Sequence, residues 1–144
     1  MYVILRFEHA DGLGIYQCGP VIPYDVARHP LPACGGGLHV WRDEYSTAER
    51  ENFFFGFDSV EQARAWFYDW KVLVTLEQHG AKLRAFVVPD HAVHVGYAQT
   101  VFKIQHATLI ASFNPTELHE ADFCDVYEAL VHTAAETYAN IDNI

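Results

Sequence analysis

The chain has 144 residues, of which 51% are hydrophobic and 15% aromatic, a composition that predicts one folded domain over residues 1–144 and excludes a disordered chain. Its formal net charge of −10 disfavours direct binding to nucleic acid or to anionic membranes, since both are negatively charged. The wide spacing of its cysteines, the lack of a leader-like start and the lack of a run of about 20 apolar residues predict a reduced protein of the cytoplasm.

The first half of the chain predicts strands, a long loop and a helix. Residues 2–8 are rich in aliphatic and aromatic types, as expected of a strand, and residues 38–41 indicate another short strand. Proline and glycine gather between residues 19 and 37, which predicts a long loop of the kind that often carries function. Ser59 is a good N-cap, and apolar residues spaced three and four apart then predict one amphipathic helix that ends at Gly80.

The second half of the chain predicts further strands and a final helix. Short β-rich runs separated by turn residues predict a β-meander within residues 83–113. An Asn-Pro-Thr-Glu sequence at residues 114–117 is typical of a helix start, so the last helix is expected over residues 114–140. The order of elements indicates an α+β fold with a mostly antiparallel sheet, in which residues 2–113 form the body. One amphipathic helix is central to this body, and the C-terminal helix is acidic.

The negative charge is concentrated towards the end of the chain. Residues 104–144 contain seven acids and no lysine or arginine, a net charge of −7, whereas twelve acids and nine bases leave the first 103 residues at −3. The helix dipole favours acids in the first turns of the last helix, so one interpretation is a plain solvated face. The other is an anionic stripe that docks onto a basic partner protein. The candidate partner-binding residues are Glu117, Glu120, Asp122, Asp125 and Glu128.

Arg6 is the main candidate for a small-molecule site. Strand alternation places Arg6 and Glu8 on one face of the predicted first strand. The two residues therefore predict either a structural ion pair or an anion site in which the guanidinium holds a phosphate or a carboxylate. Gln99 lies at the start of a predicted strand, where its amide is suited to orient a substrate through hydrogen bonds but cannot act as a general base.

The histidines indicate a loop contact rather than a metal site. His29 precedes a proline in the predicted loop, where it either braces the loop or helps to hold a ligand. His91 and His94 are three residues apart in a β-rich segment, and such residues point to opposite faces of a strand. We therefore expect no metal.

Several short motifs resemble a group of small phage and prophage proteins. The acidic last helix lies outside these motifs, which cover residues 2–104. The resemblance implies an origin in a mobile genetic element. The motifs are the opening strand with Arg6 and Glu8, Gly12-Leu13-Gly14-Ile15-Tyr16, His29-Pro30, Phe55-Gly56-Phe57-Asp58-Ser59, Trp66-Phe67, Gly80-Ala81-Lys82-Leu83 and Gly96-Tyr97-Ala98-Gln99-Thr100-Val101-Phe102.

The chain is also distantly similar to the ADP-ribosyltransferase fold. The resemblance implies that Arg6 takes the place of the family's basic residue on the first core strand. It also implies that Phe55 and Ser59 lie near the serine or aromatic residue that the family has on a middle strand. Gln99 stands where that family has a glutamate, and a neutral amide lacks the charge that supports oxocarbenium-like chemistry. The resemblance thus implies either a protein that binds NAD without reacting, or a catalytic set of Arg6 and Gln99 to which Glu8 adds the carboxylate.

Three functional hypotheses follow. The first is a non-catalytic phage accessory protein that binds and antagonises a host component, such as an anti-CRISPR-like antagonist of host defence, through its acidic surface and without a cofactor. The second is an NAD-using or NAD-binding protein of the ADP-ribosyltransferase type. The third is a structural or assembly protein of a virion. The candidate ligand-binding residues are Arg6, His29, Phe55, Ser59 and Gln99, and only the second hypothesis gives catalytic roles to Arg6, Gln99 and Glu8.

Overall fold

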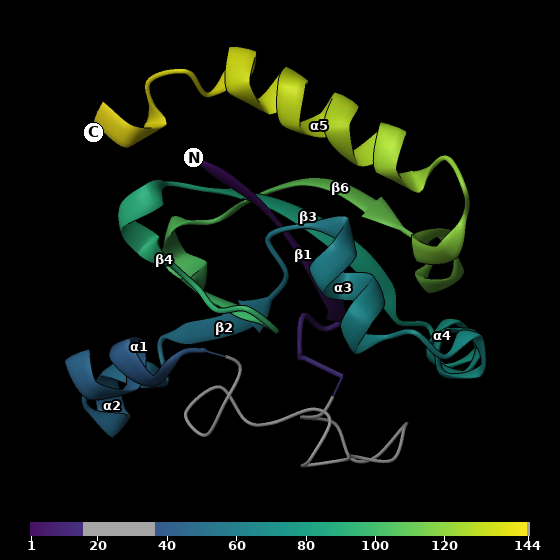
Figure 1. Ribbon diagram of the computed structural model, residues 1–144, viewed down its shortest axis with the longest axis horizontal. Helices are drawn as coiled ribbons and strands as arrows, with labels where there is room; N and C mark the ends of the chain where they lie inside the picture. Colours follow the sequence, from purple (N-terminus) through teal and green to yellow (C-terminus); the bar gives the residue numbers. More distant parts are fainter. Residues whose placement is uncertain (16–36, 144) are drawn as a thin grey trace.

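The protein has the predicted α+β fold, with two antiparallel sheets and helices packed around them (Figure 1). The computed structural model describes residues 1–15 and 37–143, so His29 lies outside the described residues. Four short 3₁₀ helices also occur in the described residues, namely η1 (Asp90–Ala92), η2 (Ile104–His106), η3 (Pro115–His119) and η4 (Ile141–Asn143). The strands and α-helices are β1 (Tyr2–Glu8), α1 (His39–Glu44), α2 (Thr47–Arg50), β2 (Phe53–Gly56), α3 (Val60–Trp66), α4 (Trp70–Gln78), β3 (Lys82–Val88), β4 (Val93–Val95), β5 (Thr100–Lys103), β6 (Thr108–Phe113) and α5 (Phe123–Thr137).

The strands are divided between two sheets, in the orders β1-β3-β6 and β2-β5-β4, which we call sheet A and sheet B. The predicted β-meander within residues 83–113 is wrong, because β3 pairs with β1 and β6 while β4 pairs with β5 in the other sheet. Most of β3 is buried, and a buried strand needs a neighbour on each edge to satisfy its backbone N–H and C=O groups. The turn at residues 89–92 therefore carries the chain from sheet A to sheet B.

Sheet A lies between sheet B and a layer of helices. One face of β1 presents Val3, Leu5 and Phe7 to a core cluster that includes residues of α3, α4 and α5. The opposite face presents Ile4 to a second cluster, which includes Phe102 of β5. Successive side chains of a strand point to opposite faces, so the largely apolar sequence of β1 serves two cores at once.

The two sheets are joined at one point between β1 and the end of β2. Leu5 and Phe57 exchange two backbone hydrogen bonds, each 2.8 Å long. Gly56 makes this approach possible, because a Cβ atom there would lie 2.5 Å from the carbonyl oxygen of Leu5. The side chain of the next residue on β1, Arg6, is therefore held next to β2.

The amphipathic helix predicted between Ser59 and Gly80 is interrupted and forms α3 and α4 as separate helices. Asp69 lies at the interruption, where its carboxylate accepts the backbone N–H of Lys71 at 2.9 Å and caps α4. Aspartate is a strong N-cap because it satisfies an N–H group that has no partner within the helix. Trp70, which the spacing of three and four residues places on the apolar face of the predicted single helix, is consequently 52% exposed.

Two predicted boundaries are also wrong. Residues 38–41, predicted as a strand, are instead helical: Leu38 is the N-cap of α1, and residues 39–41 form its first half. The final helix begins at Phe123 rather than at residue 114, because residues 115–119 form a separate 3₁₀ helix. The predicted helix-start chemistry is nevertheless present, since the backbone N–H of Asn114 donates to the carboxylate of Glu117 at 2.6 Å.

Candidate functional site

The inner face of α5 is fixed against the rest of the protein. Phe123 and Ala134 are buried in the same core as β1. The hydroxyl oxygen of Tyr127 lies 2.7 Å from the carbonyl oxygen of Val3 and 2.8 Å from that of Asp58, and these two acceptors share its single O–H proton. Burial raises the pKa of this hydroxyl well above its ordinary value, so the tyrosine stays protonated and remains a donor. The helix is thus held in one orientation relative to sheet A.

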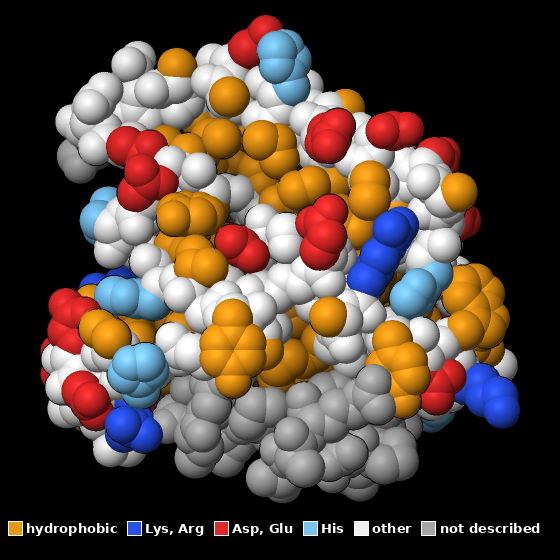
Figure 2. Space-filling view, viewed as in Figure 1, with side chains coloured by type: hydrophobic (Ala, Val, Ile, Leu, Met, Phe, Trp, Pro, Cys, Tyr) orange, Lys and Arg blue, Asp and Glu red, His pale blue; other side chains and the backbone are white. Residues whose placement is uncertain are grey.

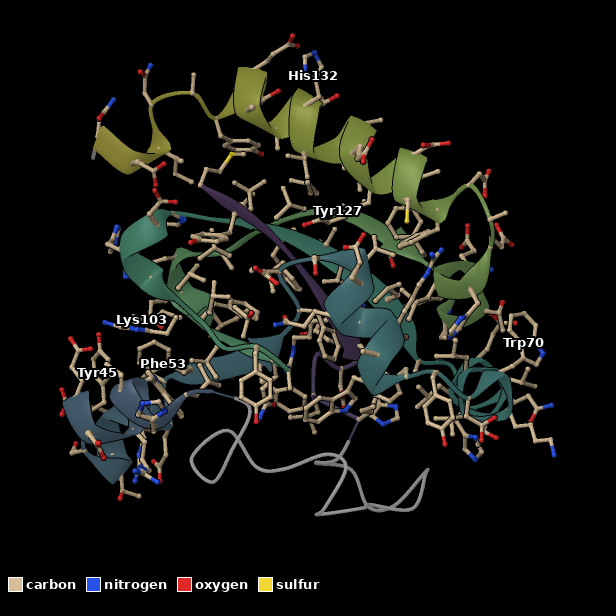
Figure 3. The ribbon with its side chains drawn as sticks, viewed as in Figure 1. Tyr45, Phe53, Trp70, Lys103, Tyr127 and His132 are labelled. Carbon is tan, nitrogen blue, oxygen red and sulfur yellow. The ribbon has the colours of Figure 1, made fainter. Side chains whose placement is uncertain are left out.

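The outer face of α5 is acidic and exposed. His132 points away from the protein, on the side opposite to Tyr127 (Figure 3), and it lies 3.2 Å from a carboxylate oxygen of Glu136. Aspartate and glutamate side chains follow the edge of the molecule that α5 occupies (Figure 2). We call the exposed carboxylates on and just before α5 the acidic face. They belong to Glu120, Asp122, Asp125, Glu128 and Glu136.

Four of the five predicted partner-binding residues lie on this acidic face, and Glu117 does not. Glu117 is half-buried, and its carboxylate accepts the N–H of Asn114. The backbone just before α5 is anchored by Arg64, whose guanidinium donates to the carbonyl oxygens of Leu118, at 2.8 Å, and Glu120, at 2.9 Å. The guanidinium of Arg64 therefore fixes the start of the acidic face through backbone groups.

Arg6 and Glu8 form the predicted ion pair on the face of β1 that is directed toward sheet B. Nε of Arg6 donates to one carboxylate oxygen of Glu8 at 2.9 Å, and the two residues are 2% and 3% exposed. Arg84 lies opposite Arg6 on β3, and its Nη1 donates to the other carboxylate oxygen at 3.0 Å. One buried carboxylate thus serves two guanidinium groups. The sequence predicts only the first contact, because Arg84 is remote along the chain.

The guanidinium of Arg6 also reaches β2. Its Nη1 donates to the carbonyl oxygen of Phe55 at 2.8 Å, and its Cζ lies 4.5 Å from the ring centroid of Phe54 and 5.6 Å from that of Phe55. Burial lowers the pKa of Arg6, and the hydrogen bond and charge of Glu8 oppose that effect. A pocket of about 380 Å³, which we call the Arg6 pocket, is lined by Arg6, Glu51, Phe53, Phe54 and Phe55.

Ser59 and Gln99 belong to a different set of contacts, centred on Gln62. The hydroxyl of Ser59 accepts the N–H of Gln62 at 3.1 Å, which confirms the predicted N-cap. The side-chain amide of Gln62 donates to the carbonyl oxygen of Gly96 at 2.6 Å and accepts the hydroxyl of Thr100 at 3.0 Å. Gln99 is fully buried, and its backbone carbonyl accepts the N–H of Gly96 at 2.9 Å. The only signal for Gln62 in the sequence is its position three residues after the N-cap Ser59, a spacing typical of a capping box.

The predicted ligand-binding residues therefore lie in two places. Arg6, Glu8 and Phe55 meet where β1 and β2 diverge. Ser59 and Gln99 lie on the segments that Gln62 connects. The catalytic and NAD-binding roles of these residues stay predictions.

The part of the chain that the structure describes contains neither a metal-binding cluster nor a helix that could span a membrane. Across residues 1–15 and 37–143, no three histidine, cysteine, aspartate or glutamate side chains are grouped so that they could hold a metal ion. No helix in this same part is both long enough and apolar enough to cross a membrane. The Arg6 pocket and the acidic face are two candidate sites among the described residues.

The family of the protein is indicated by comparison with known proteins. No curated protein and no solved structure matches the chain. Residues 1–116 match the family model described as Bacteriophage T4 Y00F protein. The matched residues include β1 to β6 and the Arg6 pocket, and they end before α5. Because this match covers most of the chain, the protein belongs to the Bacteriophage T4 Y00F protein family and is a phage protein.

Proposed function

We propose that this phage protein is a non-catalytic accessory protein that binds a basic surface on a host protein through its acidic face, and that it thereby antagonises a component of host defence. The observation that carries the proposal is the two-sided character of α5. Its inner face is buried and hydrogen-bonded, whereas its outer face holds exposed carboxylates. Membership of a phage family supports a role in an infected bacterial cell.

Few positive charges within residues 104–144 offset the negative charge of the acidic face. Residues 104–144 contain no lysine or arginine. Among the contacts given for the described residues, one on this face places the His132 imidazole 3.2 Å from the Glu136 carboxylate, which is an ion pair only when the histidine is protonated, and the two side chains are 79% and 71% exposed. Exposed pairs of this kind contribute about 0.3–0.5 kcal/mol. The carboxylates therefore contribute little to folding, and their charge remains available to a partner.

The rigidity of α5 suits an electrostatic docking surface. The helix has 15 residues, so its carboxylates keep a fixed spacing. A preorganised row of negative charge attracts a basic surface over about one Debye length, roughly 8–10 Å, and raises the association rate. Such a row competes for the same basic surfaces that hold phosphate backbones. Host proteins that handle nucleic acid are therefore the partner class that fits this face best.

Charge neutralisation tests the proposal. The acidic-face variant carries Asp122→Asn, Asp125→Asn and Glu128→Gln. A matched control removes three exposed carboxylates elsewhere, with Asp43→Asn, Glu44→Gln and Glu51→Gln. Tagged wild type and both variants are used to capture proteins from a lysate of the phage's bacterial host, at low and at high salt.

We expect the wild type and the control to retain the same host protein at low salt and to release it at high salt, because the contact is mainly electrostatic. The acidic-face variant should retain at least tenfold less. Equal retention by both variants, or retention that salt does not affect, would contradict the proposal. Copurification of the protein with phage particles, unaffected by either variant, would instead favour a structural role in the virion.

A further inference from the structure

The Arg6 pocket is lined by Arg6 of β1, by three residues of β2 and by Glu51, which precedes β2. The two strands are joined at Leu5 and Phe57, and beyond that point Arg6 reaches across to the carbonyl oxygen of Phe55. The pocket lining is largely apolar, since three of its residues are phenylalanines, while its charged groups are Arg6 and Glu51. Its volume of about 380 Å³ falls at the small end of the range for small-molecule sites, which is roughly 300–1,000 Å³.

The charge around Arg6 is unbalanced. Arg6 and Arg84 share the single carboxylate of Glu8, so the three side chains carry a net positive charge. The side chain of Arg84 is 22% exposed, and water can solvate part of its charge. The side chain of Arg6 is only 3% exposed, and a buried charge of this kind is costly unless it is fully compensated.

Arg6 also has more hydrogen-bond donors than the described residues satisfy. A guanidinium has five N–H groups. The described acceptors of Arg6 are Glu8 and the carbonyl oxygen of Phe55, each of which takes one. The ring of Phe54 covers one face of the guanidinium, with 4.5 Å between Cζ of Arg6 and the ring centroid. The remaining N–H donors point outward in the plane of the guanidinium, at its edge. An edge with free donors is the part of a guanidinium that recognises carboxylates.

We propose that the Arg6 pocket binds a small organic monoanion, whose carboxylate is held by the guanidinium of Arg6 and whose apolar part contacts the phenylalanine walls. The bound carboxylate supplies the negative charge that the Arg6–Glu8–Arg84 cluster lacks. Glu51 lines the same pocket and is exposed, so it disfavours a second negative charge on the ligand. The site therefore prefers a carboxylate to a doubly charged phosphate. This proposal is independent of the acidic face.

Three probes of similar size test the proposal on the full-length protein. Benzoate has the anionic head and the apolar body, benzyl alcohol has the body without the charge, and phenyl phosphate carries a second negative charge. Binding is followed by NMR, through the Nε–H signal of Arg6 and the ring signals of Phe54. We expect benzoate at millimolar concentration to shift both signals and to bind at least tenfold more tightly than benzyl alcohol.

Phenyl phosphate should bind more weakly than benzoate. Equal binding of benzoate and benzyl alcohol, no shift with benzoate, or tighter binding of phenyl phosphate would each overturn the proposal.

Two variants locate the site. Arg6→Lys keeps the charge but removes the fork of donors, and it should weaken benzoate binding by about tenfold.

Glu51→Gln changes an exposed side chain and should leave folding intact, so it provides a test even if Arg6→Lys does not fold. It should strengthen benzoate binding by roughly threefold, the size expected of one partly screened charge. The matched control Glu128→Gln should leave binding unchanged. The same affinity for wild type and Glu51→Gln would contradict the proposal.

Discussion

This protein has carboxylates in two contrasting environments, one buried in the interior and the other exposed to solvent. Glu8 is 3% exposed and contacts the guanidinium groups of Arg6 and Arg84, whereas the carboxylates of the acidic face lie in water. Water can replace a lost partner at the surface but not in the interior, so the same chemical change has different consequences in the two regions. The buried carboxylate is required for stability, and the exposed carboxylates are free to serve binding.

Removal of the charge of Glu8 is expected to have the largest effect. Glu8→Gln leaves Arg6 buried without its counter-charge, and we expect the free energy of unfolding to fall by about 3–5 kcal/mol. Equilibrium unfolding in urea measures this loss. Asp125→Asn on the acidic face is the control, and it should change the free energy of unfolding by less than about 0.5 kcal/mol. Similar losses in the two variants would show that the two regions do not differ as described.

The contact that holds the acidic face in place is expected to have an intermediate effect. Tyr127→Phe removes the hydroxyl whose proton the carbonyl oxygens of Val3 and Asp58 share, and it leaves these part-buried acceptors without that donor. We expect a loss of about 1–2 kcal/mol in the free energy of unfolding. Tyr138→Phe is the control on the same helical segment, since no hydrogen bond of its hydroxyl is described. An equal loss in both variants would point to general packing instead.

The pH dependence of stability gives a second measurement on Tyr127. Burial raises the pKa of Tyr127 in the folded protein, whereas in the unfolded chain the pKa has the ordinary tyrosine value of about 10. As the pH rises, Tyr127 therefore loses its proton in the unfolded state before it does so in the folded state. The stability that this hydroxyl contributes is therefore complete below about pH 10 and declines above it. Tyr127→Phe should show a weaker decline between about pH 9 and 11 in urea unfolding. Identical profiles would rule out this assignment.

Neutralisation of the acidic face is expected to have the smallest effect on stability. Asp122→Asn, Asp125→Asn and Glu128→Gln each remove an exposed charge from a segment without lysine or arginine. We expect each to change the free energy of unfolding by no more than about 0.5 kcal/mol. Added salt should stabilise the wild type slightly more than the triple variant, because salt screens the repulsion among these carboxylates. Thermal unfolding at two salt concentrations tests this, and a loss of several kcal/mol would assign the acidic face to folding instead.

Features that depend on near neighbours in the chain were predictable. The run of aliphatic and aromatic residues predicts β1, and the alternation along it places Arg6 beside Glu8, where the structure has their ion pair. Ser59 caps α3 because its hydroxyl reaches an N–H only three residues ahead. The excess of acidic residues in residues 104–144 follows directly from the amino-acid sequence and does not depend on how the chain folds.

Features that depend on contacts between distant segments were decided by the tertiary structure. The sequence alone determined that β1 is a strand, which residues share a face of β1, and that the end of the chain is acidic. The tertiary structure decided that β3 lies between β1 and β6, that Arg84 becomes the second partner of Glu8, and that Arg6 donates to Phe55. The reason is physical: caps and periodicity involve groups a few residues apart, whereas pairing and burial depend on which surfaces the whole chain brings together.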